Sequence, residues 1–108
     1  MAVSFKEFER MDIRVGRVVD AEKVSGSKRL VRIMVDIGEK EPRQVIAGIA
    51  DHIDPKSLPG KNVIVLANLE PKKFMGLESR GMLLAADVNG KPVLLTVEED
   101  VPPGTKVR

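Results

Sequence analysis

The side chains best suited to chemistry in this chain are basic, and they gather in the connector NLEPKKFMGLESRGM at residues 68–82. Lys72, Lys73 and Arg80 supply its positive charge, while one proline and two glycines interrupt regular structure. A connector of this length in a small domain usually serves a function. Ammonium and guanidinium groups bind phosphate, but solvated basic loops are also common on protein surfaces. The connector therefore predicts either an anion-binding loop or a solvated one.

The chain lacks the residues on which most catalytic sites are built. It has no cysteine, and its one histidine, His52, lies in a polar stretch just before a helix start. Asp51 and Asp54 flank it with the spacing of ordinary capping carboxylates. Neither glycine of the connector has the strand-to-helix setting and Lys-Ser/Thr ending of a phosphate-binding loop. We expect a non-enzyme with no catalytic residue, no metal site and no cofactor.

Length and charge set the class of protein. The 108 residues are enough for one domain, residues 1–108, with a core that needs no disulfide or metal. The net charge is only +2, so any contact with a polyanion must come from local clustering of basic residues. No stretch resembles a signal peptide or approaches the length of a membrane span. We expect a soluble, cytoplasmic protein.

Short apolar segments predict an all-β fold. The expected strands are residues 13–23, 30–37, 43–49, 62–69, 81–88 and 92–97. The second alternates cleanly, with its β-branched residues facing inward, and the fourth is apolar on both faces and therefore central. Gly16 predicts a bulge or bend in the first strand. Asn89-Gly90 predicts a hairpin between the last two strands.

Two short helices complete the pattern. Ser4 and Glu7 have the spacing of a capping box, which predicts a helix that ends near Arg10 or Met11. Asp54-Pro55 predicts a single helical turn between the third and fourth strands. Five short strands, this intervening turn and a C-terminal β extension are typical of the OB-fold, a small Greek-key barrel.

The predicted barrel brings a second basic cluster beside the connector. Lys28, Arg29 and Arg32 lie in the loop before the second strand and on the exposed face of that strand. In an OB-fold this loop and the fourth-to-fifth connector flank the same binding face. The two clusters therefore favour one nucleic-acid-binding patch.

The scarcity of aromatic residues indicates which nucleic acid would suit this patch. Phe74 is its only ring, whereas proteins that bind extended strands usually stack bases on several rings. The patch should therefore bind the shape and backbone of a folded RNA. Asn68 and Ser79 could bond phosphate or 2′-hydroxyl groups, and Met82 could contact a base or ribose. The predicted RNA-binding residues are Lys28, Arg29, Arg32, Asn68, Lys72, Lys73, Phe74, Ser79, Arg80 and Met82.

Three motifs resemble the tRNA-binding domain family. They are DIRVG at 12–16, VIAGIA at 45–50 and NLEPKKFMGLESRGMLLAA at 68–86, and the resemblance covers nearly the whole chain. The family includes stand-alone dimeric tRNA-binding proteins, the C-terminal appendage of bacterial methionyl-tRNA synthetases and a small subunit that accompanies the archaeal synthetase. It implies an OB-fold homodimer that grips the outer corner of tRNA by shape.

The resemblance also implies roles for particular residues. By motif position, Asn68, Lys72, Ser79 and Met82 carry over as tRNA contacts. The implied dimer contact uses the N-terminal helix and the C-terminal strands. It fits Phe5 and Phe8, which so short a helix cannot bury by itself. The implied dimer residues are Phe5, Phe8, Val93, Leu95 and Val97.

One loop departs from the family pattern. Many relatives carry KHPxADKL where this chain has KVSGSKRL at residues 23–30. The His-Pro is absent, Lys28 replaces the aspartate, and Arg29 takes the basic position. This loop leans toward an archaeal-type partner subunit of methionyl-tRNA synthetase. The initial Met and the ending VPPGTKVR favour a free-standing protein.

Two other functions remain as alternatives. One is an export-related chaperone of the same fold that binds unfolded polypeptide in an apolar groove; the intact connector motif argues against it. The other is a pure dimerisation module, which predicts no salt-sensitive RNA binding. The preferred hypothesis is a non-catalytic dimer that raises the concentration of tRNA at a synthetase.

Overall fold

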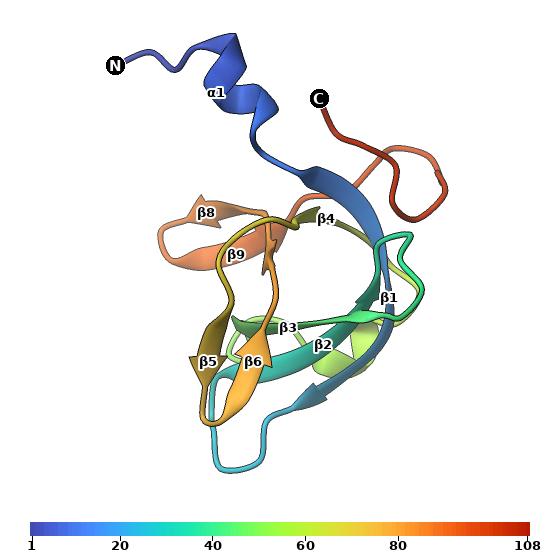
Figure 1. Cartoon of the computed structure of the whole chain (residues 1–108). Helices are drawn as coiled ribbons and strands as arrows, with labels where there is room; N and C mark the ends of the chain where they lie inside the picture. The colour runs from blue at the N-terminus through green and yellow to red at the C-terminus, as the bar shows by residue number, and fades with distance from the viewer.

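A nearly closed barrel of antiparallel strands forms the body of the protein in the computed structural model, which describes residues 1–108 (Figure 1). The barrel strands are β1 (Ile13–Lys23), β2 (Leu30–Asp36), β3 (Arg43–Gly48), β4 (Asn62–Leu66) and β7 (Met82–Leu83), in the order β3-β2-β1-β4-β7. The Arg80 amide donates to the Gln44 carbonyl at 2.9 Å and brings the two edges of this sheet together. The predicted five-stranded OB-type barrel is confirmed.

Both predicted helices form. Ser4 accepts a hydrogen bond from the Glu7 amide, and the Glu7 carboxylate accepts one from the Ser4 amide, which completes the capping box of α1 (Phe5–Glu9). Asp54 caps the 3₁₀ turn η1 (Pro55–Ser57). No residue of α1 is buried, and Figure 1 shows the helix standing apart from the barrel. No helix in the structure is long and apolar enough to cross a membrane.

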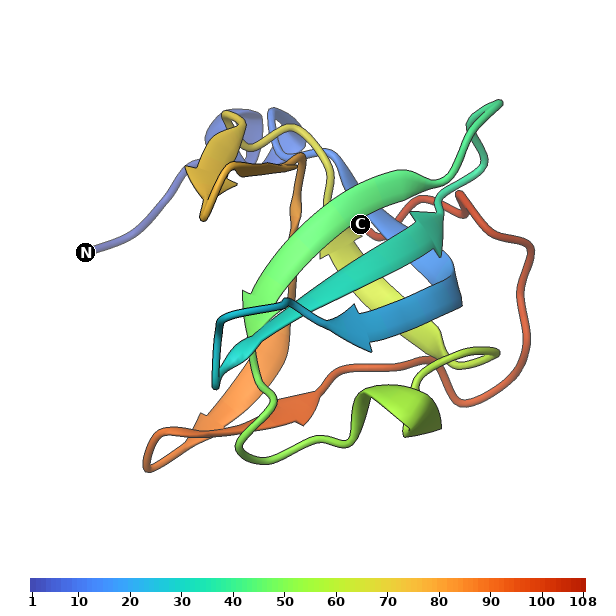
Figure 2. The ribbon, with the colours of Figure 1, turned by 90° about the horizontal axis from the view of Figure 1, so that it is seen from below.

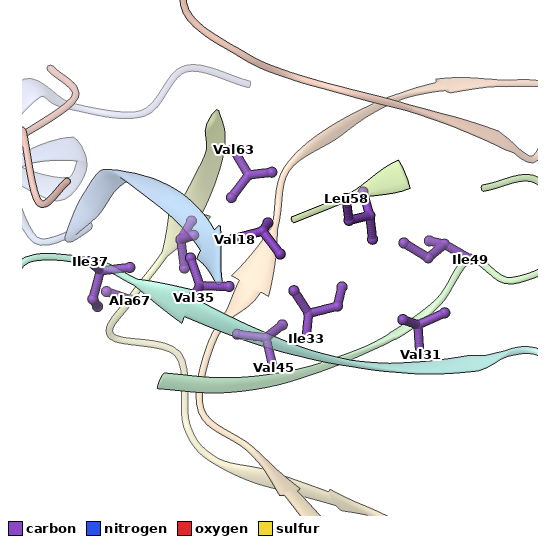
Figure 3. Packing of buried hydrophobic residues seen from close by; sticks show 11 residues of the cluster. Val18, Val31, Ile33, Val35, Ile37, Val45, Ile49, Leu58, Val63 and Ala67 are labelled. Carbon is purple, nitrogen blue, oxygen red and sulfur yellow. The ribbon is translucent and has the colours of Figure 1, made fainter. Parts of the chain in front are cut away.

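The core lies inside the barrel and is built from β-branched residues. Val31, Ile33, Val35 and Ile37 are fully buried, as the alternation in this stretch predicts, and Figure 3 shows them among the side chains of the other strands. Burial of each such side chain stabilises the fold by about 1.5–3 kcal/mol. β4 lies between β1 and β7, which confirms its predicted central position.

The sequence predicts a bulge or bend at Gly16, but the bulge in β1 lies three residues further on. Gly16 pairs in register with Val63, and the register shift falls at Val19, which is skipped between the pairs Val18–Val35 and Asp20–Met34. Val19, which has no partner in the register, is 49% exposed. Gly16 has a packing role instead, because a Cβ there would lie 2.5 Å from Cγ1 of Val35.

The connector is more structured than the sequence predicts. β4 ends at Leu66, and the connector then carries a hairpin of β5 (Lys72–Phe74) and β6 (Leu77–Ser79). The expected strand 81–88 is divided into β7 and β8 (Ala85–Val88), and β8 pairs with β9 (Lys91–Leu94) in the hairpin predicted at Asn89-Gly90. Figure 2 shows these two hairpins as separate arms, gold and orange, on the barrel.

Candidate nucleic-acid interface

The fold brings the loop with Lys28 and Arg29 beside the β5–β6 hairpin that carries Lys72, whereas Arg32, Lys73 and Arg80 line neither of the hollows between them. A hollow of about 530 Å³ is lined by the loop of residues 26–30, by Gly48 of β3, and by Phe74 and Met75 at the tip of the β5–β6 hairpin. The contact is close, because a Cβ on Gly26 would lie 3.5 Å from Cε of Met75. The loop after β1 and the connector therefore flank one surface.

A second hollow of about 380 Å³ continues this surface. It shares Gly48 and Phe74 with the first, so the two form one groove. Its apolar lining comes from Ile46, Ala47, Leu69, Phe74, Met82 and Leu83. Lys72 and Glu70 supply its charged groups. The groove thus joins an apolar section beside Met82 to a basic section beside Lys28 and Arg29.

Four of the predicted cations are free to bind phosphate. Lys28, Lys72, Lys73 and Arg80 are exposed, and none of them forms a salt bridge. The ammonium of Lys72 lies 5.1 Å from the centroid of the Phe74 ring, in a cation–π arrangement. Lys72 therefore occupies part of the only aromatic surface in the groove.

The other two predicted arginines already have acidic partners. Arg29 is 70% exposed and lies 3.4 Å from Asp51, in a surface pair that phosphate could displace. Arg32 is half-buried, lies 3.0 Å from Glu22 and 3.9 Å from Asp20, and donates to Gln44 at 2.9 Å. Arg32 is thus neutralised on the outer face of the sheet, in contrast to the free lysines.

Ser79 and Asn68 bond to the protein itself. Ser79 is only 5% exposed, and its hydroxyl accepts from the Ile46 amide at 2.9 Å and bonds the Gly81 carbonyl at 3.2 Å. Asn68 accepts from the Asp12 amide at 2.9 Å and donates to the Arg10 carbonyl at 2.6 Å. Both side chains hold the connector in place; their contacts with RNA remain predictions.

Two residues that hold the connector in place could not be identified from the sequence. Arg43 donates to the carbonyls of Ala67 and Arg80, one at each end of the connector. Gln44 donates to the Glu78 carbonyl at 2.9 Å and so ties β6 to β3. The only sequence signal is a polar pair at the start of an apolar strand, and it does not reveal partners that lie 24 to 37 residues away.

The residues implied for a dimer contact present apolar surface to solvent. Phe5 is 74% exposed, and Phe8, Val93 and Leu95 are exposed too, whereas Val97 is half-buried. α1 and the C-terminal residues 106–108 border a hollow of about 260 Å³. Such exposed rings on a helix that buries nothing are typical of an interaction surface.

The acidic side chains and the one histidine are the residues of this chain that could hold a metal. No group of three or more His, Asp or Glu side chains is arranged to bind a metal ion. His52 is exposed and lies just before Asp54, the residue that caps η1.

Known proteins resemble this chain over its whole length. Residues 13–106 match the model of the family described as "Putative tRNA binding domain". A methionine–tRNA ligase of Archaeoglobus fulgidus is 56% identical over 105 residues, which are 97% of this chain and 16% of the ligase. The chain therefore spans about one sixth of the length of this relative.

Solved structures share the fold. A MetRS-related protein from Pyrococcus horikoshii superposes with a TM-score of 0.93 at 43% identity, covering 100% of this chain and 99% of that protein. The chaperone CsaA from Bacillus anthracis superposes with a TM-score of 0.89 at 29% identity, and both chains are fully covered. The match over residues 13–106 and the 56% identity to a methionine–tRNA ligase establish that this chain belongs to the tRNA-binding domain family.

Proposed function

We propose that this protein is a non-catalytic tRNA-binding protein that grips the outer corner of tRNA as a homodimer. It serves methionyl-tRNA synthetase in the cytoplasm, as a beta subunit or as an aid that acts in trans. The single observation that carries the proposal is the groove between the β1–β2 loop and the β5–β6 hairpin, whose apolar section is lined by the free Lys72 and whose other section is lined by the free Lys28.

The kind of RNA follows from the chemistry of this groove. Free ammonium groups attract phosphate whatever the base, and Lys72 partly occupies Phe74, the one available ring. Without further rings the surface cannot hold several stacked bases. A rigid, folded RNA backbone such as that of tRNA is the ligand that it suits.

The proposed link to the synthetase rests on the relatives. Methionine–tRNA ligases carry a segment like this chain within one polypeptide. A separate chain that binds both tRNA and the synthetase would raise the effective concentration of tRNA near the catalytic subunit. A pull-down from cell extract, scored for tRNA and for methionyl-tRNA synthetase, tests this part of the proposal. Recovery of tRNA without the synthetase would restrict the function to tRNA binding.

The groove itself is tested by a salt titration of tRNA binding. Lys72→Ala and Arg29→Ala should weaken binding to all tRNAs alike and lower the slope of log K against log salt by about one unit each. Lys91→Ala, which removes an exposed lysine from the distant β9 strand, is the control and should change neither quantity. Wild-type binding by either groove variant across the salt series would refute the assignment.

A second function is favoured by one of the comparisons. The CsaA chaperone shares the fold at 29% identity, and the apolar section of the groove could accept an extended polypeptide. A gel shift with bulk tRNA and an aggregation assay with a denatured protein separate the two functions. Suppressed aggregation without a tRNA shift would favour the chaperone.

A further inference from the structure

One side chain bonds both ends of the connector that carries the β5–β6 hairpin. The Arg43 guanidinium donates through Nη1 to the carbonyl of Ala67, where the chain leaves β4, and to that of Arg80 at 3.1 Å, where the chain returns to the barrel. No other side chain in the structure donates hydrogen bonds to both of these carbonyls. The twelve residues 68–79 between Ala67 and Arg80 are thus closed into a loop by this side chain.

The other edge of the same guanidinium is held in place. Nε donates to Glu39 Oε1 at 3.1 Å and Nη2 to Oε2 at 2.6 Å, in a two-pronged pair with the turn between β2 and β3. The hydrogen bond from Arg43 lowers the pKa of Glu39, so this carboxylate stays ionised at neutral pH. Arg43 therefore joins three chain segments that are distant in sequence.

The other side-chain hydrogen bonds that hold the hairpin act on one strand only. Ser79 Oγ and the Gln44 side chain tie β6 to β3. The segment that leads into β5 has only the contacts of Ala67 and Asn68 near the barrel. Backbone pairing of Leu66 with Met82 also holds the two ends of the connector at the edge of the barrel, and Arg43 adds a side-chain link between the outgoing and returning segments.

We propose that Arg43 is the positioning residue of this interface: it holds both ends of the connector together, so that the β5–β6 hairpin stands beside the Lys28–Arg29 loop before RNA arrives. The side chain of Arg43 is only 11% exposed, which excludes it as a major phosphate contact. Its effect is to remove the ordering cost of the hairpin from the binding step. The RNA readout of this proposal rests on the proposed function.

The geometry requires arginine at this position. Only a planar guanidinium can donate to two carbonyls on one edge and to a carboxylate on the other. A lysine ammonium has three donors at a single point and cannot span the same partners. Arg43→Lys should therefore behave as a partial loss, although it keeps the charge.

The test compares Arg43→Met with Arg80→Met, which removes an exposed arginine but keeps the Arg80 carbonyl. Amide hydrogen exchange is measured on the free proteins, and binding of bulk tRNA is measured across a salt series. Arg43→Met should speed exchange in residues 72–79 and leave the β1–β2 amides protected. It should weaken tRNA binding about tenfold with an unchanged salt slope. Arg80→Met should leave exchange unchanged and lower the slope by about one unit.

Several outcomes would overturn the proposal. Unchanged exchange in the hairpin of Arg43→Met shows that the residue does not hold it. A slope that falls by one unit shows that Arg43 contacts phosphate directly. If wild-type protein fails to bind tRNA, the proposed function is refuted, while the exchange data still decide whether Arg43 positions the hairpin.

A second variant keeps the test decisive if Arg43→Met unfolds the barrel, which loss of β1–β2 protection would reveal. Glu39→Gln releases one edge of the guanidinium and leaves both carbonyl bonds possible. It should speed hairpin exchange by a smaller factor with the barrel intact. No change in hairpin exchange in this variant also overturns the proposal.

Discussion

Asp12 is the residue whose charge the fold stabilises most clearly. Arg14 donates to it through two nitrogens at 3.0 and 2.8 Å, and Lys106 donates at 2.9 Å from the C-terminal tail. The hydrogen bonds from Arg14, with a smaller contribution from Lys106, lower its pKa from 3.8 to about 2 against the opposing effect of burial. Asp12 therefore fastens the start of β1 to the tail.

This pKa predicts loss of stability in acid. Because the folded-state pKa lies below that of the unfolded chain, the carboxylate contributes fully above about pH 4, and its contribution is lost as the pH falls through about 2. The lost free energy of unfolding is about 2 kcal/mol. Denaturant titrations between pH 5 and 2 should show a smaller fall for Asp12→Asn than for wild type.

The control for this prediction is Glu99→Gln, which removes an exposed carboxylate without a salt bridge. It should retain the acid sensitivity of the wild type. Identical pH profiles for wild type and Asp12→Asn would show that the Arg14 and Lys106 contacts do not stabilise the fold.

The sequence identifies the free cations of the site better than its supporting residues. Lysine is exposed in most settings, so Lys28, Lys72 and Lys73 could be placed on the surface from their type alone. Arg43 and Ser79 act through backbone groups of distant segments, 24 to 37 residues away. Such pairings depend on how the barrel closes, which local sequence patterns do not contain.

At the scale of elements, two hairpins with the same turn geometry differ in how well the sequence reveals them. Asn89 and Gly90 have φ of 52° and 88°, and Met75 and Gly76 have φ of 50° and 82°. Type I′ turns require positive φ at both central residues, and Asn-Gly is their strongest signal. Methionine rarely adopts this conformation, so Met75-Gly76 is not a signal for a tight turn. The sequence pattern therefore predicts a loop where the β5–β6 hairpin lies.

In β1, the alternation of apolar residues does not predict which side chains are buried. Alternation predicts burial only while the register is regular, and the bulge at Val19 reverses the faces of the residues beyond it. A glycine in a strand signals either a bulge or a close approach. Gly16 serves the second role, since Val35 occupies the space of a side chain there.

The connection of α1 to the barrel supports a prediction about Asn68. Asn68→Ala removes the bonds to the Arg10 carbonyl and the Asp12 amide, so the junction between α1 and β1 should open more often. The expected loss of stability is about 1 kcal/mol. Tryptic cleavage after Arg10 should become faster than in wild type under native conditions.

Asn62→Ala, at the start of β4, is the matched control, because Asn62 bonds Arg17 and Asp100 instead. It should leave cleavage after Arg10 unchanged. If Asn68→Ala is cleaved there no faster than this control, Asn68 does not hold the junction, and its motif position would have to be explained by RNA contact alone.

At the scale of the whole molecule, the proposed dimer can be tested independently of RNA binding. Phe5→Asp and Leu95→Asp place a charge on the exposed apolar surfaces of α1 and of the segment after β9, and both should shift the protein toward monomer. Sedimentation velocity over a range of protein concentrations measures this shift. Val19→Asp, which charges an exposed apolar site at the β1 bulge, should leave the association unchanged.

A wild-type protein that sediments as a monomer at every concentration would refute the dimer. It would leave the tRNA proposal intact, because the groove lies within one chain. Loss of association in Val19→Asp as well would mean that the charge acts through general destabilisation and not through the surfaces of α1 and of the segment after β9.

The isolation of α1 has a consequence for the thermodynamics of association. A five-residue helix is far below the length at which helices are stable in water, and α1 has a capping box but no buried residue. Ordering residues 5–9 costs conformational entropy. In the proposed dimer this cost is offset only when a partner subunit buries Phe5 and Phe8. Helix formation and subunit assembly would then be one cooperative event, and dilution would melt the N-terminus while the barrel stayed folded.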